Sequence, residues 1–283
     1  KSIREQCKCL MVLALGDDPW DSIRWQHDFP HSLKFFDIIF SADPSWNNNI
    51  RKVAPQAKIF WHFGGYDEKR FKPVNQDELT QSELEKFSAD LAFTGSSYAK
   101  KAEGAYRADV LSYLSDYNLK IWGGDKWEYR FKFNPVLQKH YQGSKLSFND
   151  LGKLYATSTI CLNLPAPQVT WGFQPRVFEI AGCKGFQIAD SRLLLRYLFS
   201  EDELIVFDSI PDLREKVDYF LKNNKERERL ANNLYKRVVN QYTWKHWATR
   251  IINTIKTDGG IEDLDLKLLD SNNSELMEIL KNA

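Results

Sequence analysis

The chain has 283 residues, a length that indicates two domains of ordinary size. Its 39 basic and 38 acidic residues leave a formal net charge of +1, which argues against a nucleic-acid or polyanion binder. Hydrophobic residues make up 43% of the chain, enough for packed cores, and no apolar run approaches the roughly 20 residues of a membrane-spanning helix.

The four cysteines predict neither a disulfide framework nor a metal site. Cys7 and Cys9 are too close together for an ordinary disulfide, and no cysteine or histidine spacing matches a zinc site. Cys161 and Cys183 lie in apolar stretches, as small buried residues do. No signal peptide is visible, so we expect a cytoplasmic protein with no membrane span.

Short apolar runs in the first part of the chain predict buried strands. They lie at 9–14, 35–41 and 58–63. The first run ends in the polar turn Gly16-Asp17-Asp18-Pro19. Residues 46–53, between the second and third runs, predict a short helix.

A polar segment separates this part from the rest of the chain. Residues 64–83 contain Pro73 and show no helical or strand period, which is typical of a linker. We therefore expect a first domain at 1–80 and a second at 81–243. Residues 244–283 are predicted to form a terminal helix that returns to the first domain, followed by a polar tail.

Strands and helices alternate more regularly in the second part. Ser147-x-x-Asp150 and Ser209-x-x-Asp212 have the spacing of helix N-terminal caps, so a helix is expected after each. The predicted strands are 90–94, 119–122, 159–164, 186–189 and 204–207. Further helices are predicted at 105–117 and 193–199, and in two stretches marked by apolar residues at 230–242 and 244–255. This alternation predicts an α/β fold with a doubly wound parallel sheet.

Small or polar residues follow the carboxyl ends of many of the predicted strands. They are Gly16-Asp17, Gly95-Ser96, Gly123-Gly124, Asn163 and the loop at Gly172. Ligands of open α/β sheets bind beyond the carboxyl ends of the strands. We therefore expect these residues to converge on one edge.

Residues 172–185, GFQPRVFEIAGCKG, combine features of an anion-binding helix start. Pro175 suits the first helical turn, and Gly185 suits the C′ position after the last turn. The first N–H groups of a helix are unpaired and partly positive, and Arg176 adds a full charge. Glu179 shares the helix face with Arg176 and offers a carboxylate to ribose hydroxyls. A short core helix with a glycine stop is the alternative interpretation.

Seven segments follow one another in a familiar order. They are FDIIFSAD (36–43), HFGGYDEKRFKP (62–73), DLAFTGSSY (90–98), LKIWGGDKW (119–127), DLGKLYATSTICLNL (150–164), RVFEIAGCKGFQIAD (176–190) and YTWKHWATR (242–250). In this order the chain resembles glycosyltransferases of the GT-B fold, and most closely the CgeB-like (spore maturation protein) glycosyltransferase family. The resemblance implies two Rossmann-like domains with parallel sheets. The N-terminal one is expected to be truncated, because so few residues precede the predicted boundary.

The resemblance implies a hexosyltransferase-type reaction, in which a sugar moves from a nucleotide-sugar donor, such as a UDP- or GDP-sugar, to a glycan, protein or small-molecule acceptor. Glu179 would bind the ribose, and Arg176 would face the diphosphate at the helix N-terminus. The other residues implied on the donor are Gly95 and Ser96 near the phosphates or sugar, Trp122, Gly123 and Gly124 on the base side, and Asn163, Gly172 and Phe173 at the border of the cleft.

Sugar transfer needs a group that stabilises the leaving diphosphate and often a base for the acceptor hydroxyl. Arg176 is predicted to hold the leaving charge without a metal or another cofactor, because the acidic pattern Asp263-x-Asp265 lies in a polar tail. Asp17 or Asp18 is predicted as the base, with turn formation as the alternative. His62 is a second candidate for the base, with a structural role as its alternative.

One position departs from the pattern of the related families. They carry two glutamates eight positions apart, and Trp171 stands in the place of the earlier one. The resemblance therefore carries neither a sugar specificity nor a stereochemical outcome to this chain. A catalytically silent GT-B-like module that binds a nucleotide or a glycan is the alternative function. A dinucleotide-dependent epimerase or dehydrogenase is disfavoured, because no G-x-G-x-x-G follows a first strand.

Overall fold

The computed structural model describes residues 9–20, 28–98, 103–124, 126–144, 146–166 and 168–257. The chain divides into two compact units. Unit 1 comprises Lys1–Gly64, Gln168–Phe173 and Lys245–Ala283, and unit 2 comprises Gly65–Pro167 and Gln174–Trp244. The division at Gly64/Gly65 comes earlier than the boundary expected at 80/81. The reason is that the segment after Gly64 packs into unit 2, where the N–H of Tyr66 donates to the carbonyl of Tyr242 at 3.1 Å.

Unit 1 contains a parallel sheet in the order β1 (Val12–Leu15), β2 (Ile38–Ser41) and β3 (Lys58–Trp61). Alternate residues of a strand face opposite sides of a sheet. Ile39 of β2 accordingly packs with Ile50 of α3 (Asn47–Val53). Ile38 and Phe40 pack instead with Ile251 and Ile255 of α12 (Trp244–Thr257). The other elements of this unit are α2 (Phe29–Ser32), η1 (Leu33–Phe35) and η2 (Pro44–Trp46).

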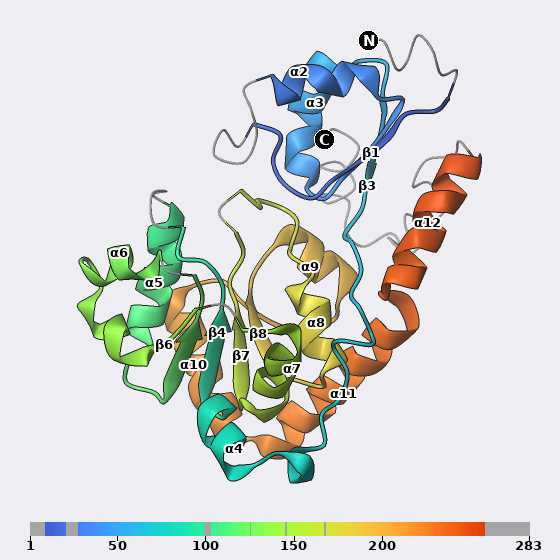
Figure 1. Cartoon of the computed structure of the whole chain (residues 1–283). Helices are drawn as coiled ribbons and strands as arrows, with labels where there is room; N and C mark the ends of the chain where they lie inside the picture. Colours follow the sequence, from blue (N-terminus) through green and yellow to red (C-terminus); the bar gives the residue numbers. More distant parts are fainter. Residues whose placement is uncertain are drawn as a thin grey trace. The chain divides into compact units, whose positions relative to one another are not determined.

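Unit 2 contains a six-stranded parallel sheet in the order β6-β5-β4-β7-β8-β9 (Figure 1). The strands are β4 (Leu91–Thr94), β5 (Leu119–Trp122), β6 (Tyr141–Gly143), β7 (Ile160–Asn163), β8 (Gln187–Asp190) and β9 (Ile205–Phe207). From β4 the chain runs outward to β5 and β6, and then returns to β7 on the other side of β4. The strand order therefore reverses between β4 and β7, where such sheets bind ligands at their carboxyl ends.

Helices cover both faces of this sheet, as the fully buried strands require. Leu91 and Phe93 of β4 face the core that contains residues of α5 and α10, whereas Ala92 faces α4 and α7. The helices are η3 (Gln76–Glu78), α4 (Gln81–Phe87), α5 (Glu103–Tyr113), α6 (Trp127–Phe131), η4 (Pro135–His140), α7 (Phe148–Thr157), α8 (Arg176–Gly182), α9 (Leu193–Leu198), α10 (Ile210–Lys222) and α11 (Asn224–Gln241). Thr94, at the end of β4, lies on the α7 side.

The two parallel sheets confirm the predicted α/β fold class, and each predicted strand is present to within three residues at its ends. The caps at Ser147 and Ser209 are confirmed, because each hydroxyl accepts an N–H three residues on, from Asp150 at 3.1 Å and from Asp212 at 3.3 Å. The elements not predicted as such are α2, η1 and η2 in unit 1, and η3, α4, α6, η4 and β6 in unit 2. Of these, η3 lies and α4 begins in the expected linker.

The end of α8 corrects one prediction. Gly185 does not occupy C′, because Lys184 stands there with a φ of 58°. Lys184 donates its N–H to Ala181 at 2.9 Å and Gly185 donates to Ile180 at 3.0 Å, which together form a Schellman motif. Gly185 is required by space instead, since a Cβ there would lie 2.6 Å from the carbonyl oxygen of Tyr155.

Several other sequence expectations concern single residues. Cys161 and Cys183 are free and buried, as predicted, and burial raises the pKa of the Cys183 thiol to about 12. Within the described ranges, no helix is long and apolar enough to cross a membrane. Cys7 and the pattern Asp263-x-Asp265 lie outside the described residues.

Candidate functional site

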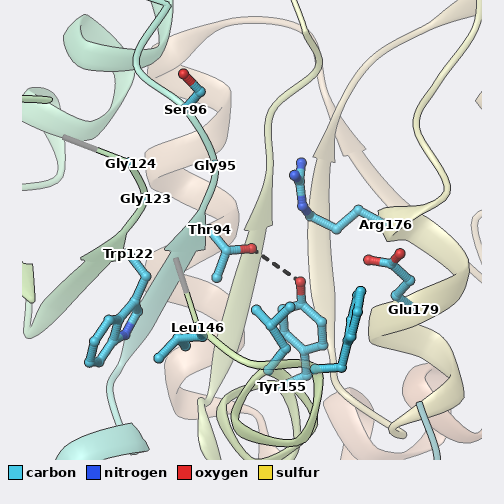
Figure 2. A pocket seen from close by; sticks show the side chains of 12 residues that line it. Thr94, Gly95, Ser96, Trp122, Gly123, Gly124, Leu146, Tyr155, Arg176 and Glu179 are labelled. Carbon is cyan, nitrogen blue, oxygen red and sulfur yellow. Dashed lines mark hydrogen bonds between the residues drawn. The ribbon is translucent and has the colours of Figure 1, made fainter. Parts of the chain in front are cut away.

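A cavity of about 400 Å³ opens in unit 2 at the carboxyl ends of β4 and β5. Strand-end loops form one side of it and helices α7 and α8 form the other (Figure 2). The lining residues are Thr94, Gly95, Ser96, Trp122, Gly123, Gly124, Leu146, Phe148, Leu151, Tyr155, Arg176 and Glu179. Seven of the ten residues expected to bind a donor are therefore brought together. They are Gly95, Ser96, Trp122, Gly123, Gly124, Arg176 and Glu179.

The cavity has an apolar end and a polar end. Trp122, Leu146, Leu151 and Phe148 form the apolar end, where Phe148 is 46% exposed. The guanidinium of Arg70 lies 4.7 Å from the centre of the Phe148 ring, which holds that ring in place. Such an end suits a flat, partly apolar group of a ligand.

Arg176 and Glu179 supply the charges of the polar end. They stand three residues apart on α8, and Figure 2 shows both side chains on the side of the cavity that holds Tyr155. Arg176 donates a hydrogen bond from Nη1 to Oε1 of Gln174 at 3.2 Å. Helix α8 has only seven residues and Pro175 is its N-cap, so the guanidinium supplies more positive charge than the short helix does.

Thr94 and Tyr155 form the floor between the two ends. Their hydroxyl groups are hydrogen-bonded at 3.1 Å, and both side chains are buried (Figure 2). Burial raises the pKa of Tyr155, so the phenol stays protonated and serves as a hydrogen-bonding group. Neither residue was predicted at the site, although Tyr155 lies in the helix expected after the Ser147 cap.

The two glycines after β5 differ in whether packing requires them. A Cβ on Gly123 would lie 2.2 Å from the carbonyl oxygen of Gly95 and 2.6 Å from Nε1 of Trp127. Gly123 is therefore required by the close approach of the two strand-end loops. A Cβ on Gly124 would meet nothing within 4 Å, so packing does not require this glycine.

Three of the predicted donor residues do not line this cavity. Asn163 is buried and donates from Nδ2 to Oε1 of Gln187 at 3.1 Å, which ties β7 to β8. Gly172 and Phe173 belong to unit 1. There the ring of Phe173 stacks on Phe63, with the ring centres 6.4 Å apart.

The predicted bases of unit 1 form hydrogen bonds within the protein. Asp18 accepts the N–H of Trp20 at 2.9 Å, the bond expected of a turn-forming aspartate. Asp17 accepts a hydrogen bond from Nε2 of Gln168, also at 2.9 Å. Nδ1 of His62 accepts from the indole of Trp247 at 3.1 Å, and burial lowers the pKa of His62 to about 4. This geometry favours the structural role for His62.

A buried carboxylate in unit 1 holds the segment in which Trp171 lies. Asp43 is fully buried, and its Oδ2 accepts the N–H groups of Thr170, Trp171 and Gly172 at 2.6, 3.0 and 3.1 Å. The sequence offered no signal for this contact, because Asp43 is far from these residues along the chain. In the residues that the structure describes, no group of three or more His, Cys, Asp or Glu side chains is placed to hold a metal ion.

Comparison with known proteins gives a family and a fold. A family model described as glycosyl transferase-like matches residues 107–253, just over half of the chain. No curated protein matches the chain in sequence. The fold is similar to that of sucrose-phosphate synthase from Thermosynechococcus elongatus, with a TM-score of 0.65, 14% identity, and coverage of 90% of this chain and 69% of that one.

Two further solved structures are similar at comparable levels. One is HepE from Anabaena in complex with UDP and glucose, with a TM-score of 0.61, 10% identity, and coverage of 88% of this chain and 72% of that chain. The other is a glycosyltransferase from Rickettsia africae ESF-5, with a TM-score of 0.62, 12% identity, and coverage of 90% and 72% respectively.

Proposed function

The chain belongs to the glycosyl transferase-like family and has the GT-B fold, and from this premise we propose that it transfers a sugar from a nucleotide-sugar donor to an acceptor hydroxyl. The proposed reaction is of the hexosyltransferase type. The donor is proposed to bind in the cavity of unit 2. The order of the segments quoted above further supports a place in the CgeB-like branch of these enzymes.

The observation that carries this proposal is the division of the cavity into an apolar and a charged end. A nucleotide sugar has the same division, because its base is flat and partly apolar while its ribose and diphosphate are polar. The cavity volume of about 400 Å³ lies in the range of small-molecule sites. Its place at the carboxyl ends of β4 and β5, beside the reversal of strand order, is where such sheets bind nucleotides.

The proposed orientation follows from the charges. The base lies between Trp122 and Phe148, with Gly124 leaving room beside it. The ribose hydroxyls donate to the carboxylate of Glu179, and the diphosphate faces Arg176 and the loop at Gly95. Arg176 stabilises the leaving diphosphate electrostatically, so we propose that no metal or other cofactor is required.

The base for the acceptor hydroxyl is proposed to come from unit 1. The two candidates are Asp17, which accepts from the side chain of Gln168, and Asp18, which closes its own turn. The acceptor is a hydroxyl group of a glycan, a protein or a small molecule. HepE was solved with UDP and with UDP-glucose, which makes UDP-glucose the first donor to test here.

A thermal-shift screen of UDP, GDP and their sugars tests the proposal. A ligand present at 100 times its Kd raises the free energy of unfolding by about 2.7 kcal/mol, so binding is readily measured. Absence of any shift at millimolar ligand would refute a nucleotide-sugar site. Nucleotide binding without sugar transfer to any acceptor offered, in the presence or absence of EDTA, would favour the silent binding module instead.

A matched pair of ligands tests the part assigned to Glu179. Glu179→Gln is expected to lower the affinity for UDP by about fivefold, because a hydrogen bond to a charged acceptor becomes a neutral one. The same variant is expected to leave 2′,3′-dideoxy-UDP unaffected, since that ligand has no ribose hydroxyls. An equal loss of affinity for both ligands would show that Glu179 does not bind the ribose hydroxyls.

A further inference from the structure

Arg107 of α5 is a charged residue that is almost completely buried. Only 2% of it is exposed, and it is not part of the cavity wall. Its guanidinium donates from Nη1 to the carbonyl of Ser96 at 2.8 Å, from Nη2 to Leu164 at 2.7 Å, and from Nε to Pro165 at 2.9 Å. These carbonyls follow β4 and β7, the two strands between which the strand order reverses. A single side chain thus ties together the loops at the place where the sheet binds ligands.

Among the described residues, no carboxylate lies within ion-pair distance of Arg107, although the negative charge of Asp190 acts on its guanidinium from farther away. Its three hydrogen bonds to the backbone go to carbonyl oxygens, and the centres of the Phe93 and Tyr98 rings lie 5.5 and 4.9 Å from its guanidinium carbon. Burial, followed by the positive charge of Arg176, lowers the pKa of Arg107 to about 9. The guanidinium groups of Arg107 and Arg176 therefore repel each other, and an anion bound near both adds to the stabilisation that Asp190 gives Arg107.

Side chains of α5 and α6 donate hydrogen bonds to the carbonyls of the loop after β4. Nε1 of Trp127 donates to the carbonyl of Gly95 at 2.9 Å, and Nη2 of Arg130 donates to that of Tyr98 at 3.1 Å. Arg107 holds the carbonyl of Ser96 between them. In a trans peptide the C=O and the following N–H point in opposite directions. The N–H groups of Ser96 and Ser97 therefore point away from Trp127 and Arg107.

From this geometry we infer that Arg107 is a positioning residue for the diphosphate of the donor. It fixes the loop so that the N–H of Ser96, a residue of the cavity wall, is directed toward an anion, and it adds a second positive charge near Arg176. Arg107 does not touch the donor, so its effect on the diphosphate is exerted through the loop and through its field. This inference rests on the proposed function, and it adds to that function the residue that prepares the phosphate site.

Binding of three ligands of increasing phosphate content tests the inference. The dissociation constants of uridine, UMP and UDP are measured by calorimetry for the whole chain, with the guanosine series run in parallel. Arg107→Met is expected to lower the affinity for UDP by about tenfold or more. The affinity for UMP should fall by less, and that for uridine by less than about twofold. Equal weakening of uridine and UDP would overturn the inference, because a merely structural role affects every ligand alike. Unchanged affinity for UDP would overturn it as well.

Arg107→Lys keeps the charge but has a single nitrogen that cannot hold three carbonyls. It is expected to lose affinity for UDP selectively and by less than Arg107→Met does. If the Met variant fails to fold, the Lys variant decides alone, and a wild-type ratio of UDP to uridine affinity in that variant contradicts the inference. Arg130→Met is the matched control, because it removes a bond to the same loop farther from Gly95. A UDP-selective loss in the control as large as that of Arg107→Met would also contradict it.

The outcome for the wild-type protein separates this inference from the proposed function. If no nucleotide of either series binds to the wild-type chain, the proposed function fails and takes the inference with it. If nucleotides bind and sugar is transferred, but both Arg107 variants keep the wild-type ratios, only the inference fails.

Discussion

Each unit holds a loop with one buried charged side chain, and the two side chains have opposite charges. In unit 1, Oδ2 of Asp43 accepts the N–H groups of residues 170–172. In unit 2, the guanidinium of Arg107 donates to three backbone carbonyls after β4 and β7. Both side chains are at most 2% exposed. The same device of one ionised group on three backbone groups is therefore used with opposite polarity.

The difference determines which loop is left with anion-binding groups. At residues 170–172 the N–H groups are already bound to the protein's own carboxylate. After β4 the carbonyls are bound instead, which leaves the loop with N–H groups and a nearby positive charge. An incoming diphosphate is therefore expected to bind at the loop of unit 2 and not at residues 170–172.

Removing the carboxylate of Asp43 is expected to have the largest effect. Asp43→Ala leaves three N–H groups without their acceptor and is predicted to lower the free energy of unfolding by about 3 to 5 kcal/mol. Urea unfolding measures the loss, and hydrogen exchange of the peptide that contains residues 168–173 locates it. Asp43→Asn, which keeps one oxygen acceptor, is the control and should lose about half as much. A loss below about 1 kcal/mol in the Ala variant would show that the hydrogen bonds between Asp43 and residues 170–172 contribute little to stability.

Lowering the pH is expected to weaken unit 1 through His62. The pKa of His62 is lowered to about 4 from an ordinary 6.5, chiefly by burial, so the unfolded chain binds a proton in this window and the folded chain does not. The contribution of His62 to the free energy of unfolding is therefore complete above pH 6.5 and is lost as the pH falls toward 4. The decrease contributed by this group amounts to up to about 3 kcal/mol.

The control for this pH dependence is His62→Gln, whose amide oxygen can still accept the Trp247 indole N–H. The variant should show a flatter decrease in stability between pH 6.5 and 4, measured by urea unfolding at each pH. The same slope in both proteins would mean that His62 is not the titrating group.

Substitution of the two glycines after β5 tests how closely the strand-end loops of unit 2 pack. Gly123→Ala forces a methyl group against the carbonyl of Gly95 and is predicted to cost about 2 kcal/mol of stability. Gly124→Ala meets no atom within 4 Å and is predicted to change stability by less than about 0.5 kcal/mol. Thermal unfolding of the two variants gives the difference. Equal losses would contradict the packing assigned to Gly123.

Arg176 tests the anion site without a large change in stability. Arg176→Met is expected to weaken UDP by about tenfold, equivalent to about 1.4 kcal/mol, because a charge-assisted contact is lost. Calorimetry measures the affinity. Arg196→Met is the control, since that arginine belongs to α9, is 44% exposed and pairs with Asp208. A comparable loss in the control would indicate a general effect of charge.

Much of the secondary structure was predictable because it depends on neighbours in the sequence. The β5 strand falls at the predicted residues 119–122, and the caps at Ser147 and Ser209 form the predicted bonds. Seven of the ten predicted donor residues line one cavity, since each lies at or just after the end of a strand or in the first turn of a helix, and such ends are marked locally. Asn163 was predicted in the same way and lies outside the cavity, because its side chain turns toward Gln187 of the next strand.

Local sequence signals account for the α/β alternation, the parallel strands, and the placing of the glycines, Arg176 and Glu179 near the strand ends. Short-range forces are sufficient for these features, because period, capping and turn chemistry act over a few residues. No local signal specifies that Arg107 ties β4 to β7 or that Asp43 holds residues 170–172. Those contacts join segments that are distant along the chain, and they form only after the order of the strands has brought the segments together.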